Sequence, residues 1–179
     1  MERSDICLII PPSPFLLDER VFLSLGILRV AAALEISGRR VEVLDLSGVK
    51  NYEDALRGYC GSRKTKTFGI TATTPQLPAA IRLSAIIRKQ KRRVIIGGPH
   101  VTLVCAASRK ESDRGITGRA SALLRNLYDS FDVVVSGDGE RSIFHAIEPN
   151  YSGLINADDP KSPLYLNSQD LGNLPMPAR

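Results

Sequence analysis

VIIGGPHVT, residues 94–102, is an apolar run that stops abruptly on two glycines, a proline and a histidine. A short, continuous apolar run of this kind is typical of a strand that is buried on both faces of a parallel sheet. Gly97 and Gly98 lack a Cβ atom, so they permit either a tight turn or the close approach of another group to the backbone. The stretch therefore predicts a buried strand whose end needs space, and the residues alone leave open what fills it.

Similar apolar runs occur along the chain, and they alternate with segments in which apolar residues have helical spacing. The predicted strands are residues 5–10, 40–46, 67–71, 93–98 and 132–137, and residues 153–157 also fit a short sixth strand. The predicted helices are residues 25–37, 52–59, 78–90, 120–130 and 140–148. The polar stretch RKESDRGITGR, residues 109–119, has no such periodicity, and we expect a mobile loop there.

This alternation predicts an α/β fold with a doubly wound parallel sheet covered by helices on both faces. Because no GxGxxG follows the first strand, a flavodoxin-like sheet of five strands in the order 2-1-3-4-5 is favoured over a dinucleotide-binding Rossmann domain. Residues 1–157 form the predicted domain. Residues 158–179 are rich in proline, asparagine and aspartate, and we interpret them as a tail or linker.

The composition fits a globular domain of 179 residues, with 43% hydrophobic and 24% charged residues. No apolar run approaches the roughly 20 residues that a membrane span needs, and no targeting segment is recognised, so we expect a cytoplasmic protein without membrane contact. The cysteines Cys7, Cys60 and Cys105 are far apart in sequence and lack the CxxC spacing of zinc or redox sites. We expect buried free thiols.

The net charge of +5 is concentrated in SRKTK, residues 62–66, and RKQKRR, residues 88–93. Basic runs can contact nucleic acid. Both runs precede strands, and the second ends a predicted helix, where cations favour the helix dipole. Neither run has interleaved aromatic residues and tryptophan is absent. We therefore interpret them as solvated helix ends, an interpretation that speaks against nucleic acid as a partner.

Ligands of doubly wound folds bind beyond the carboxyl ends of the strands, and the unusual residues of this chain follow four strand ends. The hydroxyls of TATT, residues 71–74, suit amide or phosphate groups, or they cap the following helix. GDGE, residues 137–140, leads into a helix N-terminus, where Asp138 or Glu140 could bind a ligand or simply cap. The candidate binding residues are Pro12, Ser13, Pro14, Thr71, Thr73, Thr74, Pro75, Gln76, Gly97, Gly98, Pro99, His100, Gly137, Asp138, Gly139 and Glu140.

The two histidines do not indicate catalysis. His100 has no second ligand at a recognised metal-binding spacing, so a hydrogen-bonding or packing role is favoured, and His145 fits a helix face. GxSxG, HExxH and P-loop motifs are absent from the sequence. We assign no catalytic residue and no protein ligand to a metal.

Taken together, the segments IIPPSPFLLDER, GITATTPQ, IIGGPHVT, VVSGDGE and LPMPAR resemble, in order and spacing, the N-terminal cobalamin-binding domain of class B radical SAM enzymes. The resemblance covers nearly the whole chain. It implies that Gly97 and Gly98 match the family's GG element, which lies beside the nucleotide tail of cobalamin. Thr71 matches the serine of the family's SxL element, with Thr73 in place of its leucine.

The family's wider DxHxxG element is missing, because the loop after the first strand contains no histidine. The resemblance then implies base-off cobalamin without a histidine beneath the cobalt. The lower face would be covered by the loop after the third strand, with Thr74, Pro75 and Gln76 as the candidates. The rim of the site would include His100.

Three cysteine thiolates must converge to hold the [4Fe–4S] cluster of a radical SAM enzyme, and a CxxxCxxC motif supplies them. This motif is absent from the sequence. The resemblance therefore implies a cobalamin-binding module. The cluster and SAM would belong to a radical SAM domain that follows Arg179 or lies on a partner chain. We expect no complete catalytic site in this chain, whose full enzyme would carry out methyl transfer or a related radical reaction.

Two alternatives of other classes remain open. The first is a cofactor-free regulatory or interaction domain of flavodoxin-like fold, although a response regulator would need an aspartate at the end of the third strand, where Thr71 stands. The second is a nucleic-acid-binding module that uses the two basic runs, which would bind tRNA or DNA in a salt-sensitive way.

Overall fold

The computed structural model describes residues 4–13 and 24–178. Its parallel sheet is formed by β1 (Ile6–Ile10), β2 (Val41–Asp45), β3 (Thr67–Thr71), β4 (Arg93–Gly97), β5 (Val133–Ser136) and β6 (Gly153–Asn156). The helices are α1 (Leu25–Ile36), α2 (Tyr52–Ser62), α3 (Leu77–Lys89), α4 (Pro99–Asp113), α5 (Arg119–Ser130), α6 (Gly139–Ala146) and α7 (Ser168–Gly172), and the 3-10 turn η1 (Thr74–Gln76) precedes α3.

The strand order is β2-β1-β3-β4-β5-β6, so the predicted parallel α/β fold is confirmed but the prediction of five strands is wrong. β6 pairs in parallel with β5 from Val133↔Gly153 to Ser136↔Asn156. It is a four-residue edge strand in which Ile155 alone is buried, which explains the weak apolar signal of residues 153–157. The order of the other strands is as predicted.

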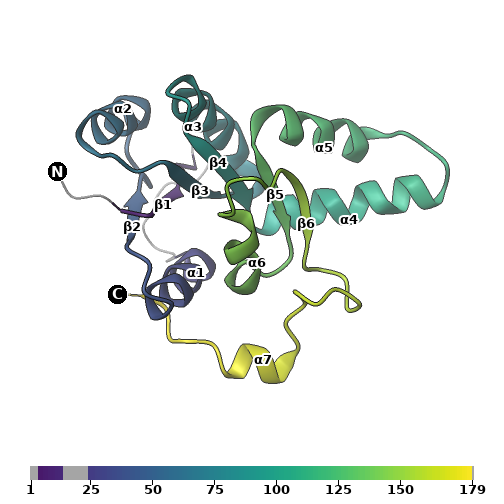
Figure 1. The fold of residues 1–179 in the computed structure, drawn as a ribbon. Coiled ribbons are helices and arrows are strands. Elements are labelled where there is room, and N and C mark those ends of the chain that lie inside the picture. The colour runs from purple at the N-terminus through teal and green to yellow at the C-terminus, as the bar shows by residue number, and fades with distance from the viewer. Residues whose placement is uncertain (1–3, 14–23, 179) are drawn as a thin grey trace.

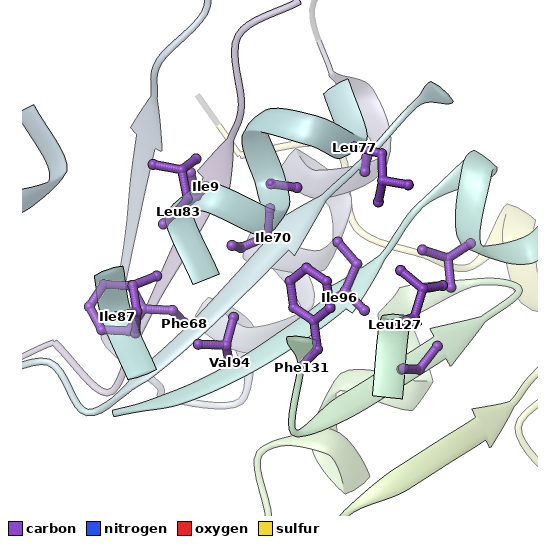
Figure 2. Close-up of a cluster of buried hydrophobic side chains, with 14 of the residues drawn as sticks. Ile9, Phe68, Ile70, Leu77, Leu83, Ile87, Val94, Ile96, Leu127 and Phe131 are labelled. Carbon is purple, nitrogen blue, oxygen red and sulfur yellow. The ribbon is translucent and has the colours of Figure 1, made fainter. Parts of the chain in front are cut away.

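Alternate strand residues face two apolar cores, one on each side of the sheet. Helices α2, α3, α4 and α5 cover one core, whereas α1 and α6 cover the other. Figure 2 shows part of the first core, where Phe68 and Val94 from neighbouring strands pack against Ile87 of α3. Because both faces are covered, the central strands are apolar at almost every position, as their sequences predict.

The expected loop at residues 109–119 is wrong, because α4 continues to Asp113 and α5 begins at Arg119. The two helices form a hairpin that extends beyond the sheet (Figure 1). Without a sheet beneath it, the outer half of α4 buries little apolar surface, and its sequence is correspondingly polar.

The turn of this hairpin is held by a helix C-cap and a single carboxylate. Gly115, at φ +67°, donates to the carbonyl of Ser112 and Ile116 donates to that of Glu111, which together form a Schellman motif. The Glu111 carboxylate accepts hydrogen bonds from the backbone N–H groups of Gly118, Ala120 and Ser121 and from the Ser121 hydroxyl. These bonds lower the pKa of Glu111 to about 2.

Residues 158–178, expected to be a tail or linker, lie against the side of the sheet covered by α1 and α6 (Figure 1). Arg141 of α6 donates to the carbonyls of Pro163 and Tyr165 and pairs with Asp170 at 3.2 Å. The N–H of Ala178 donates to the carbonyl of Leu28 in α1. The segment is therefore attached to α6 through residues 163–170 and to α1 near its end.

The three cysteines are as expected from the sequence. Cys7, Cys60 and Cys105 are buried free thiols. No helix among residues 4–13 and 24–178 is both long and apolar enough to span a membrane.

We predict that Glu111→Gln lowers the midpoint of urea unfolding at pH 7. The folded state holds the pKa of Glu111 at about 2, below its ordinary value of 4.5. The carboxylate's contribution is therefore complete above about pH 4.5 and disappears as the pH falls toward 2. The difference between wild type and variant should narrow over this interval, as measured by urea titrations at a series of pH values. Asp113→Asn, which changes a carboxylate on the same helix outside this network, should show no such narrowing.

Candidate functional site

The segments that follow β1, β3, β4 and β5 lie at one edge of the sheet, because parallel strands all end there. This edge, called the carboxyl edge below, holds the candidate binding residues that the structure describes. The exception is Pro14, which lies outside the described residues. The crevice between β1 and β3 is the point where the chain order of the sheet reverses, the usual ligand position in such folds.

Backbone hydrogen bonds continue the pairing of β3 with β4 past the ends of both strands. The N–H of Ala72 donates to the carbonyl of Gly97 over 3.0 Å, and the N–H of His100 donates to the carbonyl of Ala72 over 3.1 Å. Pro99 and His100 begin α4. The two loops therefore act as one unit, in which the start of α4 is positioned by the backbone that follows β3.

Gly98 makes this continuation possible. Its φ of +102° and ψ of 176° belong to a region that only glycine occupies readily. A Cβ atom there would lie 2.7 Å from the Thr71 hydroxyl oxygen and 2.8 Å from the nitrogen of Ala72. The space that Gly98 provides is thus filled by the protein's own chain.

Gly97 is different. Among the described residues, a Cβ atom at this position would meet only Val135, at 3.7 Å, which is an ordinary van der Waals distance. Its φ lies outside the positive range that strains other residues. Packing against residues 4–13 and 24–178 therefore does not explain why residue 97 is glycine.

The hydroxyls of TATT differ in their hydrogen bonds, and the following Gln76 connects two loops. Thr73 and Gln76 form a capping box: the Gln76 side-chain oxygen accepts from the backbone N–H and the hydroxyl of Thr73. The Gln76 side-chain nitrogen donates to the carbonyl of Pro11 over 2.8 Å, which ties the loop after β3 to the loop after β1 across the crevice. Thr71 makes no hydrogen bond through its hydroxyl to any described residue. Pro75 lies within η1 and is partly exposed.

His100 is buried, with 9% of its surface exposed. Its Nδ1 lies 3.0 Å from the Thr74 hydroxyl, and its Nε2 is buried without a partner in the part of the chain that the structure describes. Burial lowers the pKa of His100, so the imidazole is neutral at pH 7. A buried polar atom without a partner is costly, which marks Nε2 as a place where a bound group would find a hydrogen bond.

The loop after β5 joins the same network. The N–H of Gly137 donates to the Thr102 hydroxyl, which in turn donates to the carbonyl of Gly98. Gly137 has φ +90°, and a Cβ there would lie 2.6 Å from the backbone of Ala157. Gly137, like Gly98, is therefore required by the chain itself.

Asp138 and Glu140 bring carboxylates to the β5 end of the carboxyl edge. Burial raises the pKa of Asp138, assisted by the charge of Asp158 and opposed by Arg29. Burial also raises the pKa of Glu140, which is 7% exposed, although backbone N–H groups at the start of α6 lower it. The Asp138 side chain makes no hydrogen bond that caps α6. Gly139, the first residue of α6, packs against Val30 of α1, where a Cβ would approach to 2.8 Å.

Sequence reasoning missed three residues of this edge. Thr102, Arg29 and Asp158 contact the loops or shift the pKa of their carboxylates, but they come from a helix start, a helix middle and the stretch expected to be a tail. Only Thr102, inside the quoted stretch, offered a signal, since a threonine four residues after a glycine at a helix start can bond back to it. No group of three or more possible metal ligands occurs among residues 4–13 and 24–178.

A hollow of about 290 Å³ lies at the opposite, amino edge of the sheet. Ile6 and Leu34 form its apolar part, and it is lined by charges of both signs, from Asp5 and Glu148 on one hand and from Arg39 and Lys66 on the other. It contains none of the candidate residues. This hollow is therefore separate from the carboxyl edge that holds the candidate residues.

Comparisons with known proteins give a distant structural likeness. No protein-family model and no curated protein match the chain. The solved structures similar to it include two of the radical S-adenosylmethionine methyltransferase TsrM from Kitasatospora setae, one with tryptophan substrate and the SAM analogue aza-SAM bound and one with cobalamin and a [4Fe-4S] cluster bound. Each is 20% identical, with a TM-score of 0.47 over 69% of this chain. The chain spans about a quarter of their length (25% and 26%), and a likeness of this size establishes neither family nor ligand.

We predict very different effects on stability for two neighbouring substitutions. Gly98→Ala should lower the free energy of unfolding by about 2–5 kcal/mol, because backbone strain adds to a clash with the Ala72 backbone. Gly97→Ala should change it by less than about 1 kcal/mol, because its Cβ meets only an ordinary contact. Urea unfolding followed by circular dichroism measures both values. Equal destabilisation by the two substitutions would contradict the assignment of Gly98 to internal packing.

Proposed function

We propose that this chain is a cobalamin-binding module that holds a base-off corrinoid at the carboxyl edge. The observation that carries the proposal is the uncharged polar surface formed at the β1–β3 crevice by residues 11–13, 71–76 and 97–102. In these segments the one titratable side chain is His100, whose burial lowers its pKa and keeps it neutral. A corrin ring is rimmed by amide groups, which need hydrogen-bond donors and acceptors without ionic partners.

The residues present fit such a group in two respects. The Nε2 of His100 is a buried polar atom without a hydrogen-bond partner among the described residues. An amide of the ligand could supply the missing hydrogen bond and so offset the cost of burying this atom. Gly97 lacks a side chain although packing would admit one, which leaves the backbone at the end of β4 open to close approach. The carboxylates Asp138 and Glu140 lie at the β5 end, where their negative charge would disfavour an anionic ligand.

Each part of the edge has a role in the proposal. Gly97, Gly98 and Pro99 would lie beside the nucleotide tail, and the Thr71 hydroxyl would bond to it. Thr74, Pro75 and Gln76 would cover the lower face, with the Gln76–Pro11 hydrogen bond holding that loop in place. Pro12 and Ser13, which are buried, would support the loop after β1. Gly137 and Gly139 would shape the far rim. When bound, cobalamin would supply a cobalt centre suited to methyl transfer or a related radical reaction.

The module would act with a radical SAM domain, either on the same polypeptide or on a partner chain. That domain would supply the [4Fe–4S] cluster and SAM, because the CxxxCxxC motif is absent from these 179 residues. Residues 1–157 would form the binding domain and 158–179 the connection to its partner, in the cytoplasm. Catalysis would belong to the assembled enzyme.

A cofactor-free interaction domain is the second candidate. It is favoured by one specific observation: Gly98, Gly137 and the Thr73–Gln76 capping box are all explained by contacts within the chain. Two features distinguish the candidates, namely the glycine at position 97 and the Nε2 of His100, which has no hydrogen-bond partner among the described residues. A cofactor-free domain does not explain either feature.

The proposal predicts that purified protein mixed with hydroxocobalamin retains about one corrinoid per chain after desalting. The visible spectrum should be that of a base-off corrinoid without a histidine ligand, and His100→Ala should leave its band positions unchanged. Absence of retained corrinoid at micromolar protein would favour the cofactor-free domain, and a histidine-ligated spectrum would contradict the base-off assignment.

Gly97→Ala sharpens this experiment, because the substitution is expected to be neutral for folding. If the nucleotide tail lies against the end of β4, the added methyl group should weaken corrinoid retention at least about tenfold, or about 1.4 kcal/mol. Gly58→Ala is the matched control: it adds a methyl group to exposed α2, where nothing lies within 4 Å. Unchanged retention in Gly97→Ala would remove residue 97 from the site.

A further inference from the structure

The amino edge of the sheet gathers cations from three connections that are separate in sequence. These are the segments before β2, β3 and β4, and together they carry ten cations: Arg39, Arg40, Arg63, Lys64, Lys66, Arg88, Lys89, Lys91, Arg92 and Arg93. Contacts show that the connections meet. Arg39 and Lys66 line the same hollow, and Arg92 donates to the carbonyls of Cys60 and Arg63. We call this surface the basic edge.

The basic edge accounts for most of the net charge of the protein. The acidic residues near it are six, namely Asp5, Glu35, Glu42, Asp129, Asp132 and Glu148. The surplus of the ten cations at this edge is thus four positive charges, out of the net charge of +5 of the complete sequence. The remaining 14 cations and 13 acidic residues nearly balance. A charge distribution of this kind is a footprint of anion binding.

Helix dipoles do not explain the surplus. Five helices, α1, α2, α3, α5 and α6, end at the amino edge. Each contributes about half a negative charge at its C-terminus, or roughly −2.5 in total, which is smaller than the surplus of four. Solvated helix ends therefore account for only part of the two basic runs.

The cations divide into two groups. Several arginines have structural partners: Arg40 pairs with Asp5, Arg88 with Asp132, and Arg93 donates to the carbonyls of Ala146 and Pro149. A second group is exposed and makes no ion pair within the described residues; it consists of Arg39, Lys64, Lys66, Lys89 and Lys91. These five side chains are available to an external anion.

We propose that the basic edge binds the sugar–phosphate backbone of double-stranded nucleic acid. The cations spread across the starts of β2, β1, β3 and β4, three strand spacings or about 14 Å, which is wider than a single phosphate group requires. Among the described residues, Ile36 at the end of α1 is the only exposed large apolar side chain that adjoins the three connections in sequence, although the centre of a protein interface is usually apolar. They also carry no aromatic residue on which an unpaired base could stack. Contact with phosphates is therefore expected to be independent of base sequence.

The test uses fluorescence polarisation with a labelled duplex of about 20 base pairs, prepared as DNA and as RNA, at salt concentrations from about 50 to 200 mM. If five cations contact DNA phosphates, the logarithm of the association constant should fall with the logarithm of salt with a slope of about −4.5. Dissociation constants should be in the micromolar range at the lowest salt. Binding to both duplexes is expected, and their relative affinities identify the nucleic acid.

Matched triple variants locate the binding surface. The variant Lys64→Gln, Lys66→Gln, Lys89→Gln should reduce the slope by about 2.7, because three phosphate contacts are lost. The variant Lys50→Gln, Lys110→Gln, Lys161→Gln removes the same total charge from other surfaces and should bind like wild type. Equal losses in both variants, no binding by wild type, or stronger binding to poly-glutamate than to either duplex would overturn the proposal.

This experiment is independent of the corrinoid, because the substituted lysines lie at the edge opposite to the candidate binding residues. The basic-edge variant should retain hydroxocobalamin to the same extent as wild type does. A failure to bind corrinoid therefore does not contradict the nucleic-acid proposal, and a failure to bind nucleic acid does not contradict the corrinoid proposal.

Discussion

Two backbone hydrogen bonds beyond the strand ends hold the carboxyl edge together. Ala72 donates to Gly97 and accepts from His100, so the loops after β3 and β4 remain paired where strands normally separate. This pairing sets the start of α4, and α4 presents Thr102 to the loop after β5. On the other side, Gln76 reaches the carbonyl of Pro11. Four loops are thereby positioned by one another before any ligand is considered, which is the preorganisation that a binding site requires.

The molecule keeps two kinds of chemistry at opposite edges. Among the described residues, the segments that follow β1, β3 and β4 (11–13, 71–76 and 97–102) carry no aspartate, glutamate, lysine or arginine, whereas the amino edge carries most of the net charge. In a parallel sheet the two edges are one strand length apart, so each can change without affecting the other. A single small domain can therefore offer a neutral surface for a cofactor and a basic surface for a polyanion.

Much of the fold could be predicted from sequence, because strands buried on both faces are apolar at nearly every position. Residues 67–71 were delimited as the structure has them. The prediction failed where burial is slight: β6 is a short edge strand with Ile155 as its buried residue, and the outer part of α4 has no sheet beneath it. The candidate residues were predicted to follow the ends of the strands at one edge of the sheet, and those that the structure describes lie there. The sequence could not predict that Gly98, and not Gly97, is required by packing within the chain. That difference depends on the short distance from residue 98 to the backbone of Ala72.

Gly98 has a consequence for how this sequence changes during evolution. A side chain at position 98 would clash with the backbone of Ala72. A substitution elsewhere in the loop changes a side chain and cannot remove these backbone atoms. Selection for folding alone should therefore preserve glycine at position 98, whether or not a descendant binds a ligand. Position 97 is free of that requirement. If the proposed ligand lies against residue 97, then variation at 97 beside a fixed 98 among relatives of this protein would indicate that binding was lost.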